Sequence, residues 1–81
     1  MGIISEKIEG KMINVDIQSS NLAKASFDTE ASVLTVTFVS GGIYEYEKVP
    51  WEVFTKFRMA PSQGNFFNNN IAKNYSYKKL K

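Results

Sequence analysis

Apolar and polar residues alternate along three stretches of the chain with a period of two, which is typical of β-strands that bury one face. The three stretches are residues 11–17, 22–27 and 33–39. Their apolar sides are made of Ile13, Val15 and Ile17, then Ala23, Ala25 and Phe27, and finally Leu34, Val36 and Phe38. We therefore predict three strands that turn these side chains toward a shared core.

A fourth strand is predicted after a glycine-rich turn, so that residues 33–48 form a central β-hairpin. Along it, Tyr44 and Tyr46 alternate with Glu45 and Glu47. A two-residue loop would bury both glutamates against the apolar side of the preceding strand, which is too costly for charged groups. A three-residue loop over residues 40–42, a type I turn with a bulge, turns the tyrosines toward the core instead. We predict the three-residue loop.

Pro50 ends this strand, because proline cannot donate to a sheet but suits the first turn of a helix. A first helix is expected to begin at Pro50 or Trp51 and to run to about Met59. Its buried stripe is predicted to consist of Val53, Phe54 and Phe57.

A second helix is predicted after Pro61, with Ser62 as its N-cap and an end near Lys73. Its apolar residues are Phe66, Phe67 and Ile71. Gly64 is unfavourable in the first turn of a helix, which indicates the close approach of another part of the chain or of a ligand.

These elements predict an α+β fold, in which a small antiparallel sheet of three to four strands carries two C-terminal helices on one face. Residues 1–10 are expected to be an N-terminal arm or an edge strand, residues 11–77 a single domain, and residues 78–81 a basic tail.

Composition argues against catalysis. The 81 residues contain no cysteine and no histidine, which removes thiolate metal sites and the usual proton shuttle at neutral pH. The strand acids Glu45 and Glu47 and the neighbouring tyrosines are the remaining candidates for proton transfer, but no base, nucleophile and orienting group recur in a recognisable arrangement. We expect no enzyme activity, no metal and no cofactor.

The N-terminal residues lack the apolar run of a signal peptide, and no stretch approaches the roughly 20 apolar residues that span a bilayer. We expect a cytoplasmic protein without a membrane partner.

Charge is divided unevenly along the chain. Residues 1–52 contain eight acids and four bases, whereas residues 53–81 contain six bases and no acid. Such a division steers an anionic partner toward one side of a molecule. The alternatives are that the two halves attract each other or that the lysines only keep the chain soluble.

Two sequence blocks resemble the KTSC domain family. The first is Gly41-Gly42-x-Tyr44-x-Tyr46-x-x-Val49-Pro50, and the second is Ala60-x-Ser62-x-Gly64, followed by Phe67-Asn68-x-Asn70-Ile71 and Tyr75. The resemblance covers residues 20–77. KTSC domains occur at the C-terminal end of some lysyl-tRNA synthetases and as small stand-alone bacterial and phage proteins. The resemblance implies a module of unassigned function for which RNA binding is suggested, and it implies a structural role for most of the shared positions. Those positions are Tyr44, Tyr46, Val49, Pro50, Phe67, Asn70 and Ile71.

RNA or another single-stranded nucleic acid is therefore the first expected partner. Phosphates need lysine or arginine, and unpaired bases need flat rings on which to stack. The candidate residues are Lys56, Arg58, Lys73 and Lys78 for charge, and Trp51, Tyr75 or Tyr77 for stacking. The alternative is that these aromatic residues belong to the core.

A second candidate site lies at the start of the second helix, where free N–H groups bind anions and asparagines hydrogen-bond a base or a sugar. It consists of Ser62 and Gly64, followed by Asn68, Asn69 and Asn70. The alternative is a capping serine followed by solvated asparagines.

The sequence thus predicts a small non-catalytic module that binds nucleic acid through its basic C-terminal half. The alternative function is that of a phage or bacterial accessory protein of the anti-defence type, which sequesters a nucleotide messenger or binds a host protein. A phage-encoded chain would act in the host cytoplasm. Pairing through an exposed sheet edge at residues 11–17 is a further expected mode of association, and a homo-oligomer is one expected result.

Overall fold

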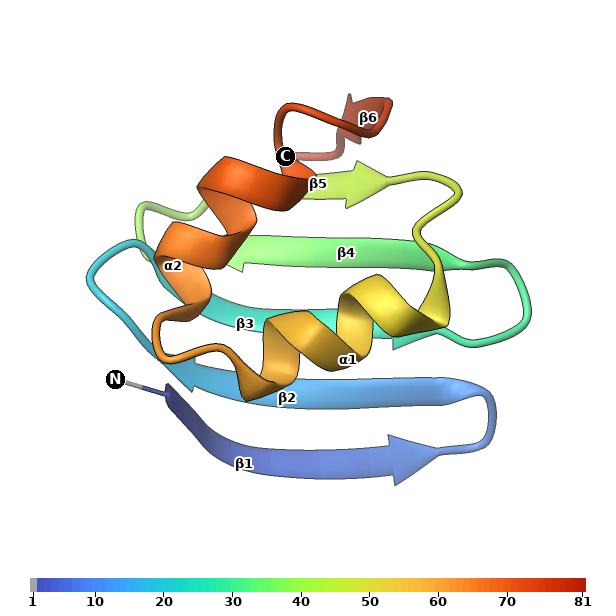
Figure 1. Ribbon diagram of the computed structural model, residues 1–81, viewed down its shortest axis with the longest axis horizontal. Coiled ribbons are helices and arrows are strands. Elements are labelled where there is room, and N and C mark those ends of the chain that lie inside the picture. Colours follow the sequence, from blue (N-terminus) through green and yellow to red (C-terminus); the bar gives the residue numbers. More distant parts are fainter. Residues whose placement is uncertain (1) are drawn as a thin grey trace.

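A single antiparallel sheet with helices on one face makes up the chain (Figure 1). The computed structural model describes residues 2–81, with side chains from residue 5 onward, so that Met1 lies outside it. The strands are β1 (Gly2–Glu9), β2 (Met12–Gln18), β3 (Leu22–Asp28), β4 (Val33–Phe38), β5 (Ile43–Tyr46) and β6 (Tyr77–Lys79), and they lie in the sheet in this order. The helical segments α1 (Trp51–Met59), α2 (Gln63–Phe66) and η1 (Phe67–Ile71) stand between β5 and β6 in the chain. The predicted α+β class is confirmed.

The predicted number of strands was wrong, because the sheet has six strands rather than three or four. The two additional strands lie at its edges. Residues 2–9 form edge strand β1, and Lys78 and Lys79, which we expected in a tail, belong to β6. Residues 11–17, expected to offer an exposed edge, lie for the most part in β2, which is an interior strand between β1 and β3. The period of two is obscured in β1 by a bulge between Ile3 and Ser5 and by Glu6, a charged residue on the helix-covered side.

In the central hairpin both tyrosines of β5 face the core, as predicted. Tyr46 lies opposite Leu34, and Tyr44 lies opposite Val36. The three-residue loop is shifted by one position and spans residues 39–41: the N–H of Gly41 donates to the carbonyl of Phe38 at 2.9 Å, and Gly41 has φ = +103°. This is a type I turn closed by a glycine in the left-handed region. Moving the loop by one residue shifts the pairing by two, so that the faces are unchanged.

One core prediction in β3 was wrong. Leu22 is fully buried, whereas Ala23, expected in the core, is only half-buried. The cause is an irregularity in the pairing of β3 with β4 between Leu22 and Lys24, which changes the phase of alternation at the start of the strand. From Ala25 onward the predicted faces hold.

The core is formed between the sheet and the aromatic faces of the helices. Phe54 of α1 stacks on Phe27 of β3 with ring centroids 4.6 Å apart, and Phe67 of η1 meets Tyr46 edge-on at 5.3 Å. The bounds predicted for the first helix match α1. The second predicted helix begins at the Ser62 N-cap as expected but continues as a π-helical turn, in which the N–H of Ala72 donates to the carbonyl of Phe67 at 2.9 Å.

A buried glutamine, Gln63, which was not among the predicted core or site residues, joins the two helices. Gln63 is 1% exposed, and its amide nitrogen donates to three carbonyls at the end of α1. The three acceptors are Phe57, Arg58 and Ala60, at 3.3, 3.2 and 3.0 Å. The side chain thereby satisfies groups that a helix end leaves without a partner inside the helix.

The opposite face of the sheet carries no helix in the described part of the chain (Figure 1). A row of mainly polar side chains crosses it from β1 to β6: Lys7, Asn14, Ser26, Thr35, Glu45 and Lys78. The aromatic residues of the described strands all lie on the helix-covered face, because they occupy the alternate strand positions whose side chains point toward the helices. No helix within residues 2–81 has the length and apolar character needed to cross a membrane.

Candidate nucleic-acid interface

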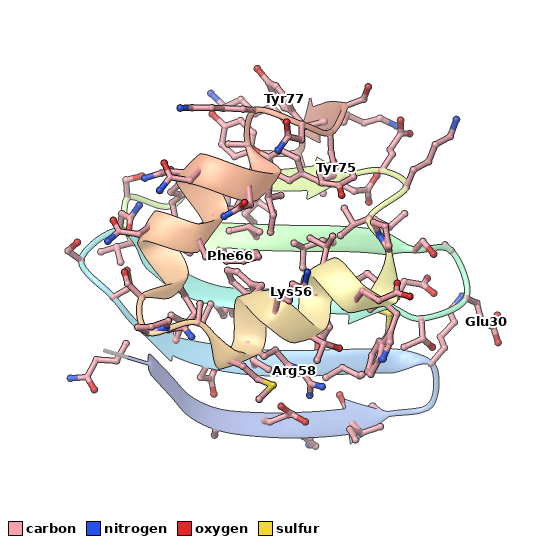
Figure 2. All side chains as sticks on the ribbon, viewed as in Figure 1. Glu30, Lys56, Arg58, Phe66, Tyr75 and Tyr77 are labelled. Atoms are coloured by element: carbon pink, nitrogen blue, oxygen red, sulfur yellow. The ribbon has the colours of Figure 1, made fainter. Side chains whose placement is uncertain are left out.

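Of the residues on α1 that were predicted to contact nucleic acid, two pack against the fold and one faces solvent. Arg58 donates to the carboxylate of Glu6 at 2.8 Å, and its guanidinium lies 5.3 Å from the ring centroid of Trp51. Trp51 is 47% exposed and also rests against Phe27, with centroids 6.1 Å apart. Arg58 and Trp51 therefore contact each other and pack against the rest of the fold. Lys56 remains exposed on α1, away from Tyr77 at the far edge of the sheet (Figure 2).

Three tyrosine rings gather at that far edge, where β5 meets β6. Tyr77 lies 5.6 Å from Tyr44 and 5.5 Å from Tyr46, measured between ring centroids. Tyr46 is almost fully buried, Tyr44 is half-buried and Tyr77 is 59% exposed. Burial raises the pKa of Tyr46, and the neighbouring Tyr77 and Tyr44 raise it further, so this ring stays a neutral phenol. The exposed ring of Tyr77 is thus backed by two others.

Adjacent lysines of β6 point to opposite faces of the sheet. Lys79 lies opposite Tyr44 and therefore shares the helix-covered side with the tyrosines. Lys78 lies opposite Glu45 and faces the bare side, away from Tyr77. Lys78 was predicted from sequence to contact the partner, whereas the alternation of the strand favours Lys79.

A surface hollow of about 640 Å³ opens beside the tyrosines. It is lined by Phe38, Ser40, Gly41, Gly42, Tyr44, Lys79 and Lys81. Its lining contains two lysine side chains and no acidic side chain, and Phe38 and Tyr44 give it aromatic walls. We call Tyr44, Tyr77, Lys79 and Lys81 the tyrosine–lysine edge.

Backbone hydrogen bonds fix the position of the last residues. The carbonyl of Ile43 accepts from the N–H of Leu80 at 2.8 Å, and the N–H of Ile43 donates to the carbonyl of Lys81 at 3.1 Å. The alternation of Tyr75 and Tyr77 was the only sign of a strand in this part of the sequence. Strand β6 is only three residues long, which is too short to show a clear period of two. Lys79 and Lys81 were therefore missed as site residues.

The second predicted site is a separate hollow of about 430 Å³, made of polar groups. The structure brings the predicted Ser62, Gly64 and Asn68 together there with Asn65 and the β2–β3 turn, residues 19–21. Several of its groups already have partners: Ser62 accepts from the N–H of Asn65 at 3.3 Å. A Cβ at Gly64 would stand 2.5 Å from Oδ1 of Asn21, so the glycine is explained by the approach of the β2–β3 turn. The lining contains no lysine or arginine.

The remaining predicted residues are scattered along η1 and the segment that follows it. Asn69 and Lys73 are exposed, and Asn70 donates from its amide to the carbonyl of Phe66 at 3.3 Å. Tyr75 is half-buried and packs against the core (Figure 2). Of the shared motif positions, Tyr46, Val49, Phe67 and Ile71 are buried, Tyr44 is half-buried, and Pro50 and Asn70 are exposed.

Comparison with known proteins places these motifs in a family. The family model of the KTSC domain matches residues 18–75. The chain belongs to the KTSC domain family. An uncharacterised protein of Stutzerimonas stutzeri is 44% identical over 57 residues, which cover 70% of this chain and 80% of that protein. The crystal structure of a KTSC domain protein from Yersinia pestis superposes with a TM-score of 0.81 at 27% identity, covering 86% of this chain and 99% of that one.

Part of a much longer enzyme is also similar to this KTSC domain. A lysine–tRNA ligase of Nostoc punctiforme is 35% identical over 63 residues, which are 78% of this chain and only 11% of the ligase. A lysine–tRNA ligase of Trichormus variabilis is 33% identical over the same length and share. The chain thus spans about a tenth of each ligase.

Proposed function

We propose that this KTSC domain is a non-catalytic module that binds single-stranded nucleic acid, RNA in particular, at the tyrosine–lysine edge. The observation that carries the proposal is the position of an exposed ring, Tyr77, on the same side of β6 as Lys79. A base stacks on the ring, and the neighbouring phosphates meet the ammonium groups of Lys79 and Lys81. The similarity to part of two lysine–tRNA ligases supports an RNA partner.

The bare face of the sheet is a less suitable surface for RNA. Its central row carries two lysines and one glutamate but no aromatic ring. Unpaired bases gain much of their binding free energy from stacking, about 1–3 kcal/mol per base. We therefore favour the edge over the bare face.

Capture of a nucleotide messenger was the alternative function, and its expected site is the hollow of Ser62, Gly64 and Asn68. That hollow has no cation in its lining. A nucleotide is held largely through its phosphates, by charge-assisted hydrogen bonds. We therefore prefer the tyrosine–lysine edge for any phosphate-bearing ligand, and nothing in the geometry favours a host protein at the polar hollow.

Fluorescence anisotropy with a short, labelled single-stranded RNA, titrated across a salt series, tests the proposal. Two phosphates neutralised by Lys79 and Lys81 give a slope of log affinity against log salt of about −1.4. Absence of binding at low salt would overturn the proposal, and equal affinity for duplex RNA would overturn its stacking component.

Neighbouring residues of β6 provide a matched pair of variants. Lys79→Ala should weaken binding and make the salt slope shallower by about 0.7, whereas Lys78→Ala, on the other face, should change neither. Tyr77→Ala should weaken binding about 5- to 150-fold, and Tyr77→Phe should retain the affinity because the ring remains. Equal losses for the two lysine variants would show that only overall charge matters.

A further inference from the structure

The two edges of the sheet differ in how they are protected against pairing. Strand β6 is three residues long and carries two lysines, which are both features that discourage edge-to-edge association. Strand β1 is eight residues long and lies at the opposite edge, with β2 as its neighbour on one side only (Figure 1). The described part of the chain covers the outer side of β1 with no further strand.

The backbone of β1 presents hydrogen-bonding groups outward at alternate residues. A two-residue turn over residues 10 and 11 joins β1 to β2, and Glu9 lies opposite Met12. Residues that flank such a turn form a hydrogen-bonded pair, so Glu9 and Lys7 direct their N–H and C=O groups to β2. The backbone groups of Glu6 and Ile8 then point away from the sheet.

The side chains of this strand suit a second copy of itself. We propose that two copies of the chain pair through antiparallel β1 strands, with Ile8 of one copy opposite Ile8 of the other. In this register residues 7–9 of the two β1 strands pair with each other, and Lys7 of each copy lies opposite Glu9 of its partner, so that opposite charges meet twice across the two-fold axis. The register also places the outward-pointing backbone groups of Ile8 against each other.

Three further observations agree with this register. Ile8 is 67% exposed on the helix-covered side, where it continues the apolar row of Ile13. The side chains of Lys7 and Glu9 are 74% and 59% exposed, and their contact of 3.5 Å within one chain is weak enough to be shared with a partner. The inward charge of Glu6, which would otherwise discourage pairing, is neutralised by Arg58 at 2.8 Å.

The proposed dimer is independent of the proposed nucleic-acid surface. Strands β1 and β6 lie at opposite edges of the sheet. Pairing at β1 therefore leaves both tyrosine–lysine edges open, at the two ends of one continuous sheet. A dimer that carries two such edges would bind a long RNA more tightly than a short one.

Sedimentation equilibrium over a wide range of concentrations tests the dimer. The expected result is a reversible change from the 9.2 kDa monomer to twice that mass. Ile8→Lys, which sets two lysines against each other, should abolish association, while circular dichroism shows an unchanged fold. A monomer at every concentration would overturn the proposal.

Charge reversal tests the register. Lys7→Glu and Glu9→Lys should each raise the dissociation constant of the dimer about tenfold or more, because like charges then meet twice. The double variant Lys7→Glu/Glu9→Lys restores both opposite-charge pairs and should restore the dimer. Insensitivity to the single reversals, or failure of the double variant to recover, would overturn the register.

A disulfide gives a geometric check, since the chain has no cysteine of its own. In a hydrogen-bonded antiparallel pair the Cα atoms are about 5.5 Å apart, which a disulfide spans. Ile8→Cys should therefore crosslink two copies on mild oxidation. Ser5→Cys, also exposed on the same strand but distant from its counterpart, should not. Equal crosslinking of both variants would contradict the pairing.

Discussion

The guanidinium of Arg58 lies 2.8 Å from the carboxylate of Glu6 and joins α1 to the edge strand β1 across 52 residues of sequence. The same guanidinium lies 5.2 Å from the ring centroid of Phe54 and 5.3 Å from that of Trp51. One cation thus neutralises the inward charge of β1 and covers aromatic surface of α1. Arg58 is a structural residue by its contacts.

Removal of this cation should destabilise the fold. Arg58→Ala is expected to lower the free energy of unfolding by about 1–2 kcal/mol, because the ion pair and the cation–π contacts are lost together. Glu6→Gln should cost less than about 1 kcal/mol, since both side chains are partly exposed. Urea unfolding at low protein concentration provides the measurement. Lys56→Ala, an exposed cation on the same helix, is the control, and an equal loss there would contradict the assignment.

Glycine should be required at position 64 because the Asn21 side chain lies so close, and not because of the helical backbone conformation. Alanine is normally favoured over glycine in a helix by about 1 kcal/mol, but here its Cβ would stand 2.5 Å from Oδ1 of Asn21. Gly64→Ala is therefore expected to be destabilising in the native background. In an Asn21→Ala background, which removes the nearest oxygen and leaves Oγ of Ser19 at 3.1 Å, the same substitution should cost clearly less. Thermal unfolding of the four proteins of this cycle measures the coupling, and additive effects would refute the close contact.

Gln63→Met should lower the free energy of unfolding by about 1–2 kcal/mol, because three carbonyls at the end of α1 lose their shared donor. Methionine keeps the shape of the buried side chain. The loss is smaller than that of three hydrogen bonds, since the buried Oε1 of Gln63, which has no partner among the described residues, is removed as well. Asn65→Ala, a change at an exposed position two residues further along α2, should leave the free energy of unfolding within about 0.5 kcal/mol of that of the native chain. Denaturant unfolding would contradict the capping role if both variants were equally stable.

Stability should fall at acid pH in part through Asp28. The backbone N–H of Ala31 is the main reason why the pKa of Asp28 lies below its ordinary value of 3.8, and the N–H of Glu30 and the nearby Lys11 lower it further. The unfolded chain therefore takes up this proton first, so the contribution is present above pH 3.8 and is lost as the pH falls below it. Asp28→Asn cannot ionise but keeps an oxygen acceptor. The stability difference between the native chain and this variant should shrink on acidification, and a constant difference would contradict the linkage.

The central hairpin could be predicted from sequence because one alternative was physically excluded. Burying Glu45 and Glu47 would have been too costly, and this fixed the faces of Tyr44 and Tyr46 although the loop was placed one residue too late. The edge strands were harder to predict. In β1, Glu6 lies on the helix-covered side, where it forms an ion pair with Arg58, and that contact is not visible in the sequence.

The candidate site could be predicted only as a region of charge. The excess of lysine and arginine after residue 52 is plain in the sequence, but the side of the sheet that each lysine faces depends on pairing with β5. This pairing places Lys79 with the tyrosines and Lys78 against Glu45. The polar groups around Ser62 could be predicted to gather at a helix start, whereas the contribution of the β2–β3 turn depends on tertiary packing.

The most direct test of the proposed function is an NMR titration of the labelled KTSC domain with a short single-stranded RNA. Binding at the tyrosine–lysine edge should shift the backbone amide signals of residues 42–46 and 77–81 in proportion to occupancy, while those of β1 and α1 stay in place. The shifts should disappear in Tyr77→Ala and persist in Lys78→Ala. Shifts confined to α1 or to the bare face of the sheet, or no shifts at low salt, would contradict the proposed surface.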